Sequence, residues 1–118
     1  MTVDVKYIES SNYLSVSCLG RYDFEALKGA IDLISEHSLN LNCPTALIDY
    51  SVIDGKLSNA DKYNIGEYIA RKLSSRTKLA VVDKPENINK FGETVAVNRG
   101  AFVRVFSNKE DAVKWLIG

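Results

Sequence analysis

The sequence has no surplus of charge of either sign. Fifteen Lys and Arg residues balance fifteen Asp and Glu residues over 118 positions, so the formal net charge is zero. Proteins that bind nucleic acid usually carry a clear excess of basic residues, because they neutralise phosphate groups. The balanced composition therefore argues against a nucleic-acid partner.

Long apolar runs are also missing. No stretch approaches the roughly 18 apolar residues that a membrane-spanning helix needs. The first ten residues, MTVDVKYIES, lack the basic and then apolar pattern of a signal peptide. We therefore expect no membrane span and a cytoplasmic location.

Residues that support catalysis or metal binding are scarce. The two cysteines, Cys18 and Cys43, lack CxxC or metal-ligand spacing, so we expect both to be reduced, buried and structural. The one histidine, His37, is expected in or just past the last turn of a helix, where the helix dipole favours a cation. No GxSxG motif, phosphate-binding loop or dinucleotide fingerprint is present. We expect no enzymatic activity, no cofactor and no metal site.

Strand and helix patterns, by contrast, alternate along the whole chain. Two runs with polar and apolar residues in alternation, joined by a short polar turn, predict an antiparallel hairpin. The remaining patterns predict buried strands and amphipathic helices in turn. The expected strands are 3–8, 13–19, 46–48, 79–82 and 101–106, and the expected helices are 23–36, 59–73, 88–99 and a last one after 107. This order predicts one α/β domain over residues 1–118, with a mixed sheet of four to five strands and about four helices.

Polar residues at the starts of the predicted helices indicate their caps. Ser58 is expected to accept a hydrogen bond from the Asp61 amide, and Asn87 to cap the helix 88–99. Ser107 begins a capping box for the last helix. Helical spacing also predicts which side chains face the core, namely Phe24, Leu27, Ile31, Ile34, Tyr63, Ile65, Ile69, Leu73, Ile88, Phe91 and Val95.

The stretch 44–61 combines a buried strand, a polar loop and a capped helix. Units of this kind bind ligands at the carboxyl end of the strand. Asp49 and Asp83 each end a buried run, so we expect both at this rim of the sheet, with Asp54 nearby. Such carboxylates either converge on Mg²⁺ or cap the turns that follow their strands, and we favour turn caps.

Three segments give the chain a family resemblance: ALID at 46–49, KLAVV at 78–82, and RGAFVRVF at 99–106 followed by a capped helix. With these segments in this order, the chain resembles the SpoIIAA-like or STAS-like domains, and in particular the small bacterial stand-alone proteins of STAS/SEC14 type. The resemblance implies the SpoIIAA-like fold. It also implies a non-enzymatic regulatory module that acts through contact with a protein partner or as a homodimer. The alternative is a small-ligand module that binds an anion, a nucleotide or a lipid.

Regulatory members of that family carry a phosphorylatable serine in an Asp-Ser-Ser or Asp-Ser-Thr motif before the helix that follows the central strand. The corresponding stretch here is IDGKLS at 53–58, in which Gly55 stands where the serine is expected. Ser58, three residues later, is the candidate for phosphorylation, and its role as a helix cap is the competing interpretation. The binding residues that we expect are Asp49, Tyr50, Asp54, Ser58 and Asp83.

Overall fold

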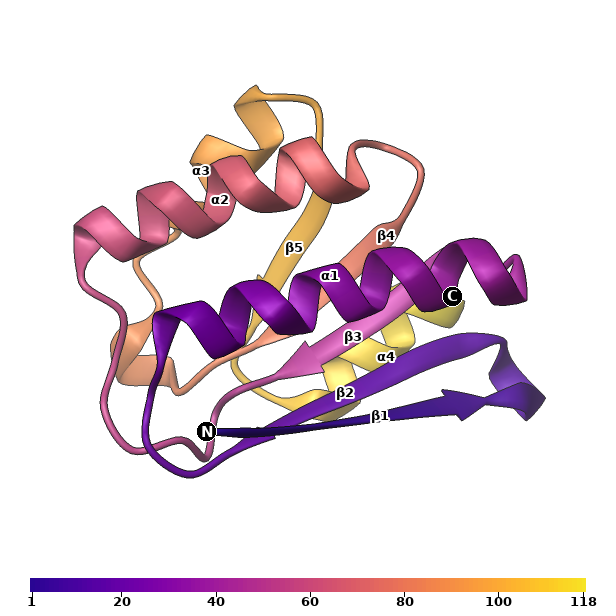
Figure 1. Cartoon of the computed structure of the whole chain (residues 1–118), viewed down its shortest axis with the longest axis horizontal. Coiled ribbons are helices and arrows are strands. Elements are labelled where there is room, and N and C mark those ends of the chain that lie inside the picture. The colour runs from indigo at the N-terminus through magenta and orange to yellow at the C-terminus, as the bar shows by residue number, and fades with distance from the viewer.

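A computed structural model describes residues 1–118 as five strands and four helices around one sheet (Figure 1). The strands are β1 (Thr2–Ile8), β2 (Tyr13–Leu19), β3 (Thr45–Asp49), β4 (Lys78–Val82) and β5 (Phe102–Phe106). The helices are α1 (Phe24–Leu41), α2 (Asn59–Leu73), α3 (Phe91–Asn98) and α4 (Lys109–Ile117). No helix is both long enough and apolar enough to cross a bilayer. The predicted order of elements is confirmed.

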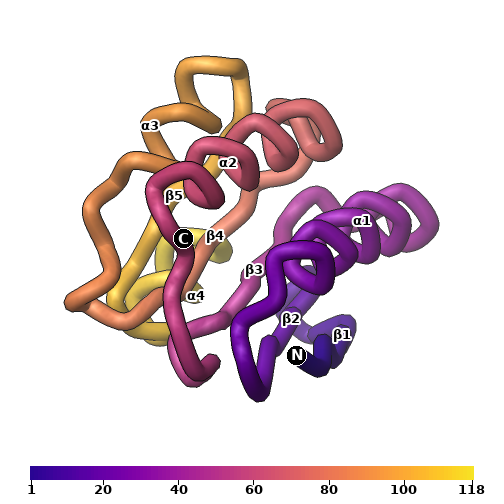
Figure 2. The backbone as a smooth tube through the Cα atoms, turned by 60° about the vertical axis from the view of Figure 1, so that its left-hand side comes forward, coloured from indigo at the N-terminus to yellow at the C-terminus, as the bar shows by residue number.

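The strands lie in the sheet in the same order as in the chain, from β1 at one edge to β5 at the other. The pair β1–β2 is antiparallel, and the pairs β2–β3, β3–β4 and β4–β5 are parallel, so the sheet is mixed as predicted. Every crossover steps in the same direction across the sheet. Right-handed crossovers of this kind place all their helices on one face, and α1, α2 and α3 indeed share one face (Figures 1 and 2).

The two faces of the sheet are covered unequally. A core of 21 buried residues lies between the sheet and helices α1–α3, whereas α4 covers the other face with a cluster of only six. Most of the hydrophobic stabilisation therefore comes from the three-helix face. Helix α4 packs on β3, β4 and β5, and of the corresponding face of β1 and β2 only Ile8 and Tyr13 join its cluster. Cys18 and Cys43 are both buried and unpaired in the larger core.

Helix α1 ends five residues beyond the expected position. It continues to Leu41 and stops where Asn42 adopts a left-handed conformation (φ +51°), with its N–H bonded to the Leu39 carbonyl. The expected end at Glu36 was wrong because apolar spacing lapses in the last turns, where Leu39 and Leu41 are exposed. His37 is consequently inside the helix, and its Nδ1 lies 2.8 Å from the carbonyl oxygen of Leu33.

The start of α3 was also predicted incorrectly. Residues 85–87 form a 3₁₀ turn without a side-chain cap, so Asn87 is not the cap of α3. The helix begins only at Phe91, after Lys90 in a left-handed conformation (φ +61°), and Asn89 accepts a hydrogen bond from the Phe91 amide at 3.0 Å.

Two further details of the helices differ from the sequence prediction. The cap of α4 is Asn108 rather than Ser107, since its side chain accepts from the Asp111 amide at 2.9 Å. Tyr63 and Phe91 were expected in the core but are exposed, with their rings 6.4 Å apart. The other predicted inward positions of α1 and α2 are buried, apart from Phe24, which is partly buried against the core.

Candidate functional site

The carboxyl ends of β3 and β4 form the rim that the sequence indicated. The backbone ladder continues one residue past each strand, because the Tyr50 amide donates to the Val82 carbonyl (3.1 Å) and the Asp83 amide donates to the Phe106 carbonyl (3.0 Å). Tyr50 and Asp83 therefore stand beside each other on neighbouring strands. They are the two predicted site residues that line one cavity.

The loop from Tyr50 to Leu57 is fixed by its own backbone. Asp54 donates from its amide to the Gly20 carbonyl and accepts at its carbonyl from the Tyr22 amide, both at 2.8 Å. The Lys84 ammonium donates to the Ile53 carbonyl, also at 2.8 Å. Gly55 has a φ of +96°, a conformation that side-chain-bearing residues rarely adopt. The loop is thus anchored to the end of β2 and to the segment after β4.

Within this loop, buried and exposed side chains are separated cleanly. Ile53 and Leu57 are buried in the main core. Val52 points outward with 63% of its surface exposed, and Asp54 and Lys56 are exposed as well. Val52 is thus an apolar side chain in solvent on an anchored loop, with polar neighbours around it, which is the arrangement of an interface with an apolar centre and a polar border.

Ser58 caps α2 as predicted. Its hydroxyl accepts a hydrogen bond from the Asp61 amide at 3.1 Å. The Asp61 carboxylate accepts from the Tyr22 hydroxyl at 2.8 Å, which connects the start of α2 to the chain after β2. The hydroxyl of Ser58 is at the surface of the molecule.

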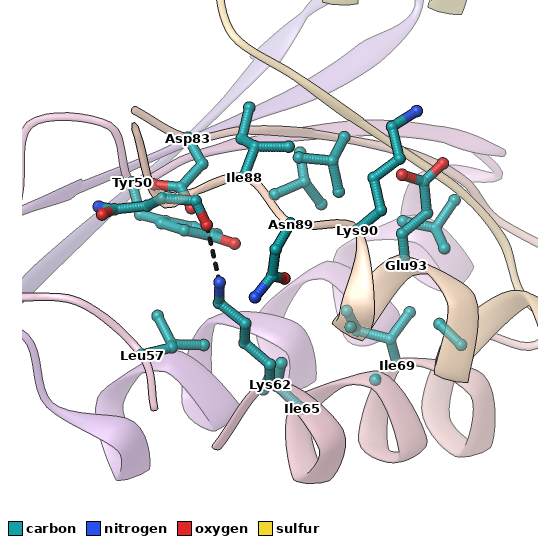
Figure 3. Close-up of a pocket in the computed structure, with 17 residues that line it drawn as sticks. Tyr50, Leu57, Lys62, Ile65, Ile69, Asp83, Ile88, Asn89, Lys90 and Glu93 are labelled. Atoms are coloured by element: carbon teal, nitrogen blue, oxygen red, sulfur yellow. Dashed lines mark hydrogen bonds between the residues drawn. The ribbon is translucent and has the colours of Figure 1, made fainter. Parts of the chain in front are cut away.

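A narrow cavity lies between α2, α3 and the carboxyl ends of the strands (Figure 3). Nine of its 17 lining residues are hydrophobic, and its volume is about 50 Å³. That volume accommodates a few water molecules. Pockets for drug-sized ligands usually enclose about 300–1,000 Å³. The cavity in this conformation is too small for a nucleotide.

Charged and amide side chains of both signs give the cavity its polarity, and its acids are Asp83 and Glu93. Burial raises the pKa of Asp83, while the hydrogen bond from the Lys84 amide (2.7 Å) and the ammonium of Lys62 act in the opposite direction. Burial and the neighbouring Asp83 carboxylate raise the pKa of the Tyr50 phenol. Glu93 contributes a carboxylate oxygen that is buried and has no hydrogen-bond partner.

Lys62 closes the cavity on the α2 side. It extends from α2 toward the segment between β4 and α3, and its ammonium donates to the Asn87 carbonyl at 2.7 Å (Figure 3). Sequence reasoning missed Lys62 and Glu93, because both occupy ordinary helix positions. Their polar atoms meet the cavity only through packing between α2, α3 and the sheet.

The remaining predicted residues do not join this cavity. Asp49 caps the turn after β3, since its Oδ1 accepts from the Ser51 amide (2.9 Å) and from the Ser51 hydroxyl (2.6 Å). Asp54 is exposed on the loop. No group of three His, Cys, Asp or Glu side chains is placed to hold a metal ion. Asp49, Asp54 and Asp83 thus do not form the cluster that the Mg²⁺ alternative needs.

Comparison with known proteins finds similarity in structure but not in sequence. No family model and no curated protein match the sequence. The structure is similar to the crystal structure of an anti-sigma factor antagonist from Mycobacterium paratuberculosis, with a TM-score of 0.68 over 98% of this chain and 92% of that chain. The chain has the SpoIIAA-like fold. At 19% sequence identity, the likeness establishes the architecture that the sequence predicted.

Proposed function

We propose that this protein is a non-enzymatic regulatory module that binds another protein. Its contact surface, called the rim surface below, consists of Val52, Asp54, Lys56 and Ser58. The exposed side chain of Val52 carries the proposal, because it presents an apolar group among polar neighbours. The fold shared with an anti-sigma factor antagonist supports a role in regulation through protein contact.

The rim surface has the composition and the backbone support of an interface. Protein interfaces commonly have an apolar centre and a polar border, as Val52 has with Asp54 and Lys56. The hydrogen bonds of the loop to Gly20, Tyr22 and Lys84 hold it in place before a partner arrives. Preorganisation of this kind lowers the entropy that binding has to overcome.

A matched pair of variants tests this proposal. Val52 is 63% exposed on the rim surface, and Leu39 is 66% exposed near the end of α1, which precedes the amino end of β3. Partners of tagged Val52→Asp and Leu39→Asp proteins would be captured from the native host, identified by mass spectrometry and re-measured with purified components. We expect Val52→Asp to weaken binding about tenfold or more and Leu39→Asp to leave it unchanged. Equal binding by both variants would refute the assignment of the rim surface.

Ser58 is the proposed site of modification on this surface. A phosphate at a helix N-terminus is favoured by the helix dipole and by unpaired amide groups. It would also add negative charge to the rim surface and alter what a partner meets. The intact mass of the protein from its native host, compared with that of a Ser58→Ala variant, tests this. An increment of one phosphate that persists in Ser58→Ala would assign the modification elsewhere.

Binding of a small ligand is the second candidate function, and the unpaired carboxylate oxygen of Glu93 favours it. A largely apolar cavity with the buried Asp83 and a buried carboxylate oxygen of Glu93 suits an apolar ligand that carries a donor group better than an anion or a nucleotide. A ligand at a hundred times its Kd adds about 2.7 kcal/mol of stability. Lipids, amines and nucleotides would be compared by thermal unfolding. Glu93→Gln, which removes the carboxylate, is the control variant. If no compound shifts the unfolding temperature of the unmodified protein, this candidate function is refuted.

A further inference from the structure

Strand β1 forms an open edge of the sheet. It pairs only with β2, and in Figures 1 and 2 no other element lies beyond it. Half of its backbone N–H and C=O groups therefore have no strand partner. Natural proteins seldom leave a seven-residue edge unprotected, because it is a template for pairing with another chain.

Side chains alternate regularly along β1. Val3 and Val5 pack against the main core on the side of the three helices. Asp4 and Lys6 therefore point to the opposite face, where only Ile8 of β1 packs against the α4 cluster. Both are exposed, and neither belongs to any of the four ion pairs of the protein. The edge thus carries one unpaired negative and one unpaired positive charge, two residues apart.

We propose that two copies of the chain form a dimer in which their β1 strands pair in antiparallel fashion about Val5. A two-fold axis beside Val5 places Asp4 of each copy opposite Lys6 of the other. It also places Val3 opposite Tyr7, a residue that is 39% exposed. Opposite charges and aromatic–β-branched pairs are favourable cross-strand neighbours. The result is one continuous sheet of ten strands.

The charges select this register over its neighbours. A pairing centred on Asp4 would set Asp4 against Asp4, and one centred on Lys6 would set Lys6 against Lys6. Like charges directly opposite each other destabilise a strand pair. A slip of one residue would turn the core-facing valines of one copy to the wrong face. Only pairing about Val5 sets opposite charges against each other and also keeps the helices α1–α3 of both copies on the same face of the joined sheet.

The other edge of the sheet lacks this complementarity. Strand β5 has the sequence FVRVF, and Arg104 at its centre is its only charged residue. Antiparallel self-pairing centred on β5 would oppose two arginines. The self-complementary pattern therefore points to β1 as the dimer edge.

The dimer would leave the rim surface available. Thr2 pairs with Leu19, so β1 begins near the end of β2 to which the rim loop is anchored. Antiparallel pairing then sets the two rim surfaces at opposite strand ends of the joined sheet. This inference does not depend on the proposed partner, because Val52→Asp is expected to leave the dimer intact.

Charge exchange provides a decisive experiment. Sedimentation velocity over a range of protein concentrations, at low salt, would measure the dimer Kd. Asp4→Lys and Lys6→Asp each replace two attractive pairs by two repulsive ones, so each should raise the Kd about tenfold or more. An equimolar mixture of these two variants restores both attractive pairs and should form a 1:1 dimer. The double variant D4K/K6D should dimerise with itself as the unmodified chain does.

Two controls separate pairing from folding. Arg104→Glu reverses a charge on the other edge strand and should leave the Kd unchanged. Thermal unfolding at low concentration should show that each single variant is folded. An unmodified chain that stays monomeric at every concentration, a dimer that resists both single charge reversals, or a mixture that fails to associate would each overturn the proposal.

Discussion

Gly66 of α2 faces the carbonyl oxygen of Gly92 at the beginning of α3. A Cβ at position 66 would lie 2.6 Å from that oxygen and 3.2 Å from the Cβ of Val95. A Cβ on Gly92 would lie 3.1 Å from the carbonyl oxygen of Lys62. The two glycines thus permit the close approach of α2 and α3 that shapes the cavity beneath them.

The close approach predicts a strong effect of Gly66→Ala. The added methyl would overlap a backbone carbonyl, which cannot move as a flexible side chain can, so we expect a loss of about 1–3 kcal/mol in the free energy of unfolding. Gly29→Ala is the control, because a Cβ at that position of α1 has no atom within 4 Å. Its effect should be a gain of about 0.5–1 kcal/mol. Urea denaturation of both variants measures the difference, and a neutral Gly66→Ala would contradict the packing described.

The buried carboxylate of Asp83 predicts an effect of pH on stability. The pKa of Asp83 is raised in the folded state. Between the ordinary aspartate pKa of about 3.9 and the folded-state pKa, the folded protein therefore binds more protons than the unfolded chain. Asp83 therefore lowers the free energy of unfolding over that window and continues to do so at neutral pH. Asp83→Asn, which keeps an acceptor for the Lys84 amide, should stabilise the protein at pH 7 and lose this advantage below pH ~4. Urea titrations at several pH values test this, and a benefit that grows toward acid would contradict it.

The cap of α2 predicts a local loss of stability. Ser58→Ala removes the acceptor for the Asp61 amide, which typically costs about 1 kcal/mol. Ser10→Ala is the matched control, because Ser10 is exposed in the β1–β2 turn, which has no side-chain cap. Chemical denaturation should show a clear loss for the first variant and almost none for the second.

The two thiols should react only when the protein unfolds. Burial, with a smaller contribution from Asp49, raises the pKa of Cys18 to about 11, and the reactive species is the thiolate. Cys43 is buried as well, at the end of the turn after α1. Labelling with Ellman's reagent should therefore be slow in buffer and rapid in denaturant. Single Cys18→Ala and Cys43→Ala variants would show which thiol reacts, and rapid labelling in buffer would contradict the burial of the remaining one.

Much of the fold could be predicted from the sequence where local signals coincide. Helix α2 has the predicted bounds because Ser58 supplies a cap and Ile65, Ile69 and Leu73 mark one buried face. The start of α3 and the end of α1 were predicted incorrectly for the same reason. Left-handed residues, Lys90 and Asn42, set these boundaries, and neither is a glycine that would have indicated such a conformation.

The candidate site could be predicted only at its strand ends. Tyr50 and Asp83 follow buried strands, and neighbouring parallel strands bring their carboxyl ends to one rim. Lys62 and Glu93 come from two helices whose separation depends on Gly66. A contact set by the packing of distant elements has no periodic signature in the chain.

The order of strands in the sheet also bears on how the protein folds. Because every strand is added beside its predecessor in the chain, no strand has to be inserted between two that have already paired. Each parallel pair closes through a single helix, whereas the β1–β2 hairpin is the only local pairing of the sheet. The sheet can therefore grow in one direction as the chain leaves the ribosome, with β1–β2 as its first template and α4 as the last element to dock.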